Sequence, residues 1–361
     1  MKKPFIIPLV YGILLGCFGT YSVLDTLFIP KVKQTVSFDF GQYMSSNTPT
    51  SKTSTSKSSG GTQSSDKFGS AFSFEPTSSS TTSGSTTSSS SGGLPDVFSD
   101  TVIHTEDRYI DQNLHIEITT EVVQTEHLKQ DKLMDTKVYC AEIYVNHFVH
   151  LRTAFSHDKY GDNLTEWTSK NARRQGAIFA INGDTYGAQE AGYVLRNGQM
   201  FRETARRGAE CVALYKDGTM ESFYENETTL AAIKDYKGTD SAWQVWSFGP
   251  ALVKNGVRGV QKGDEVDVFS QYGNQRVSIG IIEPYHYICA VCDGRLDDSY
   301  GMQLFEMADY MISKGCKLAY NLDGGGSSAF FFNDELMNRP CTNPGYKNIK
   351  ERGVSDIVYF A

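Results

Sequence analysis

The chain has 361 residues, of which 39% are hydrophobic and 21% charged, and its formal net charge is −8. The sequence is mildly acidic and contains no block of Lys or Arg, so the basic patch of a nucleic-acid-binding protein is missing. The length suffices for one large domain or two small ones.

The N-terminus predicts a membrane anchor over residues 1–30. Lys2 and Lys3 precede a stretch without charge from Pro4 to Leu24, which is long enough to span a bilayer and favours a cytoplasmic N-terminus. The alternative is a lipoprotein signal that ends at Cys17, but apolar residues continue beyond that cysteine. We therefore expect a single-pass protein of the cell membrane, with its folded part outside the cytoplasm.

The next segment, residues 31–99, is interpreted as a disordered linker. Residues 41–95 are almost all Ser, Thr and Gly, and such a composition cannot bury enough apolar surface to offset its chain entropy. The folded domain is accordingly expected over residues 100–361, which is a comfortable size for one core.

Within this domain the chain alternates short strands, tight turns and few helices. Strands are predicted over 113–123 and 138–155, followed by a helix over 163–176 closed by Gly176 and a short apolar strand over 177–183. Asn-Gly or Asp-Gly pairs predict hairpins within 193–203, 211–224 and 243–260. The remaining predicted elements are two strands over 275–295, a helix over 301–315 with an apolar stripe, and strands around 318–332 and 354–360.

No regular alternation of strand and helix occurs, so an α+β fold with a mixed, largely antiparallel sheet is expected, and a doubly wound α/β fold is the alternative. Six cysteines lie beyond the anchor, and Cys289 and Cys292 form a C-x-x-C pair inside a predicted strand. No second pair completes a zinc site, so the cysteines are interpreted as small buried hydrophobes.

Three predicted strands end in polar residues and glycine, which is where sites tend to be built. These ends are Asn182 to Asp184, Asp293 to Arg295, and the run "NLDGGGSS" from Asn321 to Ser328. The glycines Gly324, Gly325 and Gly326 with Ser327 could form an anion-binding nest of backbone amides. The run is neither a Walker A loop, since no Lys follows it, nor a dinucleotide-binding turn.

Carboxylates and arginines near these ends are the candidate functional groups. Arg276 and Arg295 could bind an anion in bidentate fashion, although a surface ion pair is the simpler interpretation of each alone. Asp184, Asp293 and Asp323 are candidate catalytic carboxylates, with turn capping as the alternative. Asp323, between Asn321 and the glycines, is the strongest of the three.

Taken together, several motifs resemble the phosphodiester glycosidase family over roughly residues 110–361. They are "AINGDTYG", "GYVLRNGQMFR", "FGPALVKNG", "QRVSIG", "CDGR", the block from "GMQLFEMADYM" to "NLDGGGSSAFFF", and the terminal "ERGVSDIVYF". Bacterial members of this family are often labelled exopolysaccharide-biosynthesis proteins. The predicted membrane anchor and low-complexity linker of this chain also resemble those members.

The resemblance implies a hydrolase that cleaves a sugar-1-phosphodiester at the anomeric carbon of a cell-surface glycopolymer. Asp323 would act as nucleophile or as base for water. The phosphate would be stabilised by Arg276, Arg295, Arg352 and the amides of Gly324 to Ser327. Asn182, Asp184 and Asn321 would hold sugar hydroxyls or orient water.

Two other functions stay open at this point. A non-catalytic surface protein could bind cell-wall polymers or polysaccharides through the same cleft. A metal-dependent phosphodiesterase would call for a cluster of His and Asp, whereas the His residues here are scattered. No cofactor is expected to be required, although a structural cation such as calcium could bind among the Asp and Asn oxygens.

Overall fold

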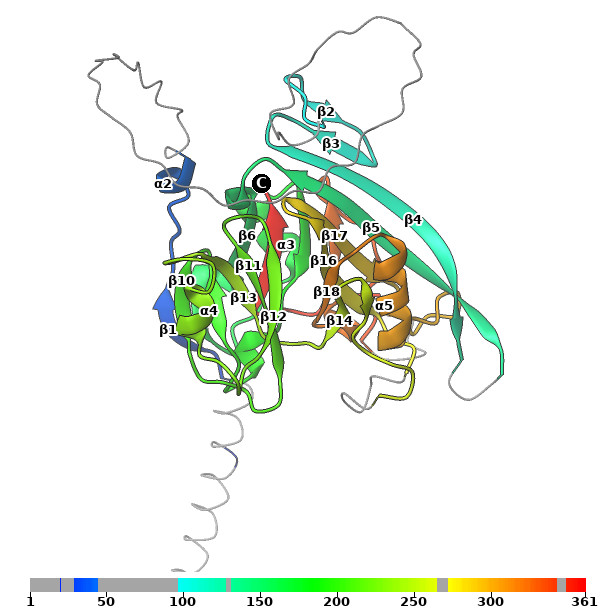
Figure 1. Cartoon of the computed structure of the whole chain (residues 1–361). Helices are drawn as coiled ribbons and strands as arrows, with labels where there is room; N and C mark the ends of the chain where they lie inside the picture. Colours follow the sequence, from blue (N-terminus) through cyan, green and yellow to red (C-terminus); the bar gives the residue numbers. More distant parts are fainter. Residues whose placement is uncertain (1–19, 21–28, 45–96, 128–130, 265–271, 343–348) are drawn as a thin grey trace, which may run out of the picture. The chain divides into compact units, whose positions relative to one another are not determined.

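The computed structural model describes residues 20, 29–44, 97–127, 131–264, 272–342 and 349–361 (Figure 1). The chain divides into two compact units, Met1–Phe40 with Asp96–Ala361, and Gly41–Pro95. Of the second unit only the short helix α2 (Gly41–Met44) is described. The site and all the sheets belong to the first unit.

The largest sheet has nine strands in the order β15-β14-β18-β16-β17-β5-β4-β3-β2, and each neighbouring pair is antiparallel. The long β4–β5 hairpin runs along one side of it (Figure 1). The strands are β2 (Ile103–His104), β3 (Arg108–Ile110), β4 (Leu114–Glu126), β5 (Leu133–Val145), β14 (Ala251–Lys254), β15 (Val257–Arg258), β16 (Arg276–Glu283), β17 (His286–Cys292) and β18 (Leu318–Leu322).

Helix α5 (Leu304–Ser313) packs on this sheet with the apolar stripe that the sequence predicts. Leu304, Ala308 and Met311 are buried in one cluster with residues of β5, β14, β17 and β18. A capping box between Gln303 and Glu306 starts the helix. Its C-terminal turn ends at Gly315, which has a φ of +86° as a helix-terminating glycine requires.

A second sheet contains two of the predicted hairpins. It has the order β10-β9-β13-β11-β12, and Asn197-Gly198 and Asp217-Gly218 form the turns of the hairpins β9–β10 and β11–β12. Helix α4 (Leu230–Lys234) adds Leu230 and Ile233 to its core. The strands are β9 (Val194–Arg196), β10 (Gln199–Arg202), β11 (Glu210–Tyr215), β12 (Met220–Tyr224) and β13 (Ala242–Trp246).

The third sheet brings the last strand of the chain against the middle of the domain. Its order is β20-β19-β8-β21-β6, again antiparallel, and helix α3 (Thr168–Gln175) packs on it. Short 3₁₀ turns, η2 (Phe148–His150), η3 (Ser156–Asp158), η4 (Tyr186–Ala188) and η5 (Gly325–Ser327), join several elements. The strands are β6 (Leu151–Phe155), β8 (Phe179–Asn182), β19 (Phe330–Phe332), β20 (Glu335–Leu336) and β21 (Asp356–Phe360).

The sheets agree with the predicted α+β class, because all named strand pairs in the described part of the chain are antiparallel and the helices are few. Two boundaries were wrong. The strand expected over 138–155 is broken by η2, so that β5 and β6 belong to different sheets. The helix expected from residue 163 begins at Thr168, because Glu166 forms a β-bridge with Val354 and Trp167 is still extended, with a ψ of 140°.

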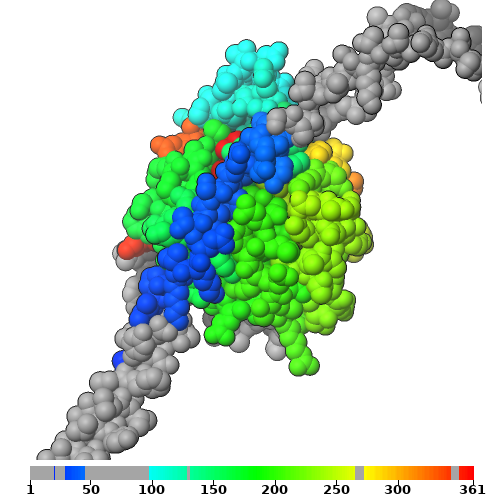
Figure 2. Space-filling model, turned by 90° about the vertical axis from the view of Figure 1, so that its left-hand side faces the viewer, coloured from blue at the N-terminus to red at the C-terminus, as the bar shows by residue number. Residues whose placement is uncertain are grey.

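The start of the predicted linker was also placed wrongly. Strand β1 (Lys31–Thr35) pairs with β7 (Lys159–Asp162), and the amide of Val36 donates to Asp158 O at 2.9 Å. Phe38 packs with Phe155 and Phe201 in an aromatic cluster. In Figure 2 this N-terminal segment lies in blue across the surface of the domain. Residues 31–40 are therefore part of the fold, whereas most of the predicted linker lies outside the described residues.

The predicted anchor also lies almost wholly outside the described residues, at 1–19 and 21–28. Among the helices that are described, none has the length and apolar character needed to cross a bilayer. The prediction that the cysteines behave as buried hydrophobes is confirmed, since the six beyond the anchor are all buried. Burial raises the pKa of the Cys292 thiol to about 12, which makes it unreactive at neutral pH.

Candidate active site

The ends of two strands from different sheets meet at Asn182. This residue closes β8, and its side-chain amide donates to Asp323 O at 2.7 Å, just after the end of β18. Its carbonyl oxygen accepts from the amide of Ala329 at 3.1 Å. Asn182 is fully buried, so both halves of its amide hold the chain together and are not free to bind a sugar as predicted. The contact fixes Asp323 at the junction of the sheets.

Each of the three glycines after Asp323 is required by a different neighbour. A Cβ on Gly324 would lie 2.7 Å from Gln275 O, and one on Gly326 would lie 2.3 Å from the Thr342 hydroxyl. Gly325 has a φ of +59°, a conformation that side chains other than that of glycine rarely adopt, and it faces the guanidinium of Arg295. The glycine run is therefore explained by close packing of the protein itself.

The predicted anion nest is smaller than four amides. Those of Gly325, Ser327 and Ser328 donate to backbone carbonyls at 2.9, 3.3 and 3.1 Å. In the part of the chain that the structure describes, the amides of Gly324 and Gly326 make no hydrogen bond. These two amides could still donate hydrogen bonds to an anion beside Asp323.

Asp323 lies directly before the glycine turn, and its side chain is 13% exposed. Its carboxylate is 3.5 Å from Arg352 Nη2, and Ser327 and Thr185 contribute hydrogen bonds. Burial raises the pKa of Asp323 above its ordinary value, while the positive charge of Arg352 and these hydrogen bonds oppose the rise. A partly exposed carboxylate with a raised pKa is suited to proton transfer or nucleophilic attack near neutral pH.

Two guanidinium groups flank the glycine turn. Arg352 donates from Nε and Nη2 to the Ser327 hydroxyl at 3.0 and 2.6 Å, and its side chain is 46% exposed. Arg295 donates from Nε to Asn274 Oδ1 at 2.9 Å and from Nη1 to Thr342 O. Burial lowers the pKa of Arg295, and the like charge of Arg352 lowers it further. Two converging cations with one neighbouring carboxylate favour the binding of an anion.

The other predicted carboxylates are buried in ion pairs. Asp184 is fully buried and accepts from Arg196 Nη2 and the amide of Ser247, each at 2.8 Å. Asp293 is also fully buried and holds the amide and Nε of Arg339 at 2.8 and 2.9 Å. Neither side chain is exposed to a substrate, so the structure favours positioning roles over the catalytic roles predicted for them.

Two further predicted binding residues are likewise buried. Arg276 donates to Met302 O at 3.0 Å and to Tyr272 O at 3.2 Å, which makes it a brace between β16 and two loops. Asn321 donates to Gly249 O at 2.8 Å. The structure brings some of the predicted residues together around the glycine turn. They are Asp323, the three glycines, Ser327, Arg295 and Arg352.

Sequence reasoning missed the buried ion network beside Asp323. Arg196 is fully buried between Asp184 and Asp356, with Nη2 and Nε at 2.8 and 2.9 Å from their carboxylates. Burial raises the pKa of Asp356 to about 7, and the charge of Asp184 adds to the rise while Arg196 opposes it. The signal in the sequence was a lone acid inside the apolar strand "SDIVYF". Thr185, with a φ of +57°, was missed because nothing local marks it.

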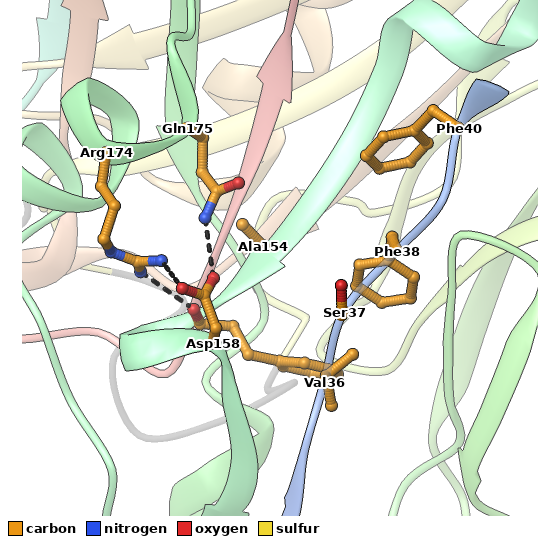
Figure 3. Close-up of a pocket in the computed structure, with 9 residues that line it drawn as sticks. Val36, Ser37, Phe38, Phe40, Ala154, Asp158, Arg174 and Gln175 are labelled. Carbon is orange, nitrogen blue, oxygen red and sulfur yellow. Dashed lines mark hydrogen bonds and ion pairs between the residues drawn. The ribbon is translucent and has the colours of Figure 1, made fainter.

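A cavity of about 290 Å³ lies elsewhere, beneath the N-terminal segment (Figure 3). Val36, Phe38 and Phe40 line one side, and Arg174, Gln175 and Asp158 line the other. Gln175 donates to Asp158 at 2.8 Å, and Arg174 forms an ion pair with the same carboxylate. Its polar groups are thus paired with each other, and none of the predicted site residues lines it.

The predicted cation site has little support in the geometry. Within the described ranges, no group of three or more His, Cys, Asp or Glu side chains is placed to hold a metal ion. The carboxylates of Asp184 and Asp293 are already neutralised by arginines. The described site therefore consists of a carboxylate, a hydroxyl and two guanidinium groups around a glycine turn.

Replacing Gly326 with Ala tests whether the turn is set by protein packing. The new methyl group would overlap Thr342, whose Cα would be 2.9 Å away, so backbone must move. Overpacking of this kind costs about 1–3 kcal/mol, and we expect a lower melting temperature together with reduced activity. Thermal unfolding checks the first effect. Removing the Thr342 side chain in a double variant with Thr342→Gly should restore part of the stability, and no restoration would contradict the explanation.

The fold is a β-rich domain in which one partly exposed carboxylate lies near two guanidinium groups, an arrangement suited to the hydrolysis of an anionic substrate. Residues 175–361, more than half of the chain, match the family described as phosphodiester glycosidase. The chain belongs to the phosphodiester glycosidase family, as the resemblance implied. The family supports a glycosidase-type hydrolytic function.

Individual relatives are distant. The uncharacterized SPbeta prophage-derived protein YomE of Bacillus subtilis strain 168 is 28% identical over 185 residues, which are 50% of this chain and 28% of that protein. The catalytic domain of zebrafish N-acetylglucosamine-1-phosphodiester α-N-acetylglucosaminidase, auto-inhibited by its pro-peptide, is 19% identical with a TM-score of 0.55. That match covers 68% of this chain and 83% of the zebrafish chain, and it shows a shared fold.

Proposed function

We propose that the protein hydrolyses the glycosidic C–O bond of a sugar-1-phosphodiester in a cell-surface glycopolymer or exopolysaccharide. The observation that carries this is the convergence of Arg352, Arg295 and Asp323 around the glycine turn. A phosphodiester supplies the anion that two arginines favour, and its anomeric carbon supplies an electrophile for the carboxylate. The substrate of the zebrafish enzyme, as its name gives it, has the same chemistry.

The leaving group explains why one carboxylate with arginines suffices. A phosphomonoester has a second pKa of about 6, so it departs far more readily than the alkoxide of an ordinary glycoside. A strong general acid is therefore less needed. Arg352 and Arg295 would stabilise the charge that develops on the phosphate, and Asp323 would act as nucleophile or as base for water.

The membrane anchor is a part of this proposal that rests on sequence alone. The uncharged stretch from Pro4 to Leu24 and the Ser/Thr/Gly-rich residues 41–95 would hold the domain outside the cytoplasm, near the surface polymers. Fractionation of cells that produce the full chain, with protease added from outside, would test it. Protection of the domain in intact cells would overturn the proposed location.

The activity is tested with the full chain, because a fragment that starts at Asp100 would lose β1 and Phe38. The protein is incubated with an α-N-acetylglucosamine-1-phosphodiester and related sugar-1-phosphodiesters, and free sugar and phosphomonoester are assayed. Release of both supports the proposal. A folded protein that binds these compounds and releases neither product would favour the non-catalytic binding function.

Arg352→Gln gives a prediction with a pH readout. The charge of Arg352 holds down the pKa of Asp323, so its removal raises that pKa further. If ionised Asp323 is the active form, the acid limb of the kcat/KM profile moves to higher pH, and activity at neutral pH falls by about tenfold or more. Arg258→Gln, which removes an exposed arginine paired with Asp309, is the control. An unmoved acid limb would contradict the pairing of Arg352 with the catalytic carboxylate.

A further inference from the structure

A cavity of about 520 Å³ is lined by residues that have no role in the hydrolysis derived above. Its walls come from the loop before β11, which carries Arg206 and Arg207, from Phe248 and Gly249, and from Gln189. Tyr224 of β12 forms a further wall. The lining thus combines guanidinium groups, aromatic rings and an amide, which are the groups that bind sugar rings and phosphates.

Two of these walls continue directly from segments that hold Asp323. Gly249 O accepts from the side chain of Asn321, two residues before Asp323, at 2.8 Å, and the Gly249 amide donates to Asn321 O at 3.2 Å. Gln189 follows η4, which begins directly after Thr185, one of the partners of the Asp323 carboxylate. A chain-like substrate bound at Asp323 could therefore extend into this cavity.

The arginines of the cavity differ in how they are held. Arg206 is half-buried, and its guanidinium donates to Phe248 O and to Gln189 Oε1, while Glu225 accepts from its backbone amide at 2.7 Å. Arg207 is exposed, and within the ranges that the structure describes it makes no hydrogen bond or ion pair. Arg207 is thus available to a ligand.

The acids that line the cavity have partners of their own. Glu210 forms an ion pair with Lys254, and Asp264 accepts from the amide of Gln261 at 2.7 Å. Lys254 also lies 5.1 Å from the centre of the Tyr224 ring. Glu210 is neutralised by Lys254, so the guanidinium groups of Arg206 and Arg207 outnumber the remaining carboxylate of Asp264 in the lining and favour an anion next to an aromatic face.

We propose that this cavity is a second subsite, which takes a neighbouring sugar-phosphate unit of the same glycan while Asp323 acts on the scissile one. The inference rests on the proposed function and narrows its substrate to a polymer with at least two phosphodiester linkages. Arg207 binds the phosphate of the second unit, and Tyr224 and Phe248 pack against its sugar. A substrate with a single phosphodiester occupies only the site at Asp323 and leaves the second subsite empty.

The test measures binding, so that it does not depend on turnover. The full chain with Asp323→Asn is titrated calorimetrically with two synthetic probes, an α-N-acetylglucosaminyl phosphodiester with one linkage and an oligomer with three. We expect the oligomer to bind more tightly. Arg207→Ala should weaken oligomer binding by about tenfold and change binding of the single-linkage probe by less than twofold.

Arg108→Ala, which removes an exposed arginine from β3, controls for the change in net charge. Equal affinity for the two probes, equal weakening of both by Arg207→Ala, or a matching effect of Arg108→Ala would each overturn the second subsite. The proposed function fails separately, if the unaltered protein releases no sugar from either probe. If the two probes bind equally well while the unaltered protein still hydrolyses them, only the second subsite is rejected.

Discussion

Asp323→Asn is expected to lower kcat/KM for a sugar-1-phosphodiester by about 10²–10⁴-fold, with substrate binding largely retained. The asparagine keeps the shape of the side chain and one acceptor oxygen for Ser327 or Thr185, but it can neither attack the anomeric carbon nor accept a proton from water. Steady-state kinetics with quantified sugar release measure the loss.

The stability of the same variant separates a catalytic from a structural role. Because burial raises the pKa of Asp323, its ionised form destabilises the folded protein, and this cost grows as pH rises from about 4, the ordinary range of an aspartate. We therefore expect Asp323→Asn to melt at a higher temperature than the parent at pH 7, with a smaller difference at pH 4. A structural carboxylate would give a lower melting temperature instead.

A matched substitution elsewhere controls for the chemistry of the exchange. Asp334 is 78% exposed in the turn before β20 and has a φ of +64°, a conformation that asparagine also tolerates. Asp334→Asn should leave both kcat/KM and the melting temperature close to those of the parent. Normal turnover in a folded Asp323→Asn protein would remove Asp323 from the reaction.

Much of the fold could be predicted because its signals are local. Asn197-Gly198 and Asp217-Gly218 form hairpin turns as expected, since Asn197, Gly198 and Gly218 adopt the required left-handed conformations at low cost. The stripe of Leu304, Ala308 and Met311 likewise followed from helical periodicity alone. Such elements can be predicted from a single sequence, because the pattern that specifies them lies within a few neighbouring residues.

The predictions that were wrong concern features that depend on contacts between distant parts of the chain. The pairing of β1 with β7 joins residues more than a hundred positions apart, and nothing in "KVKQT" marks its partner. The glycine run was interpreted as an anion-binding nest, but the groups that approach Gly324 and Gly326 closely are Gln275 and Thr342 of the protein itself. A pattern of residue types cannot separate a buried ion pair from an open site, which is why Asp184 and Asp293 were predicted beside Asp323.

The buried pair of Asp184 and Asp356 leads to the largest expected change in stability, that of Arg196→Met. The variant leaves two fully buried carboxylates without their shared cation, while the methionine fills a similar volume. Removing one partner from a buried ion pair typically costs about 3–5 kcal/mol of the free energy of unfolding. Chemical denaturation with urea at pH 7 measures this loss, and Arg173→Met, at an exposed ion pair, should cost far less.

The loss should depend on pH in a defined direction. The pKa of Asp356 is about 7 in the parent, where Arg196 opposes the rise caused by burial, so without Arg196 this pKa moves higher and Asp356 binds its proton more tightly in the folded state. A folded state that binds more protons than the unfolded state loses stability as pH rises. The deficit of Arg196→Met should therefore be smaller at pH 5 than at pH 8, and adding Asp356→Asn should restore part of it. A deficit of equal size at both pH values would show that lost packing, and not unpaired charge, explains the role of Arg196.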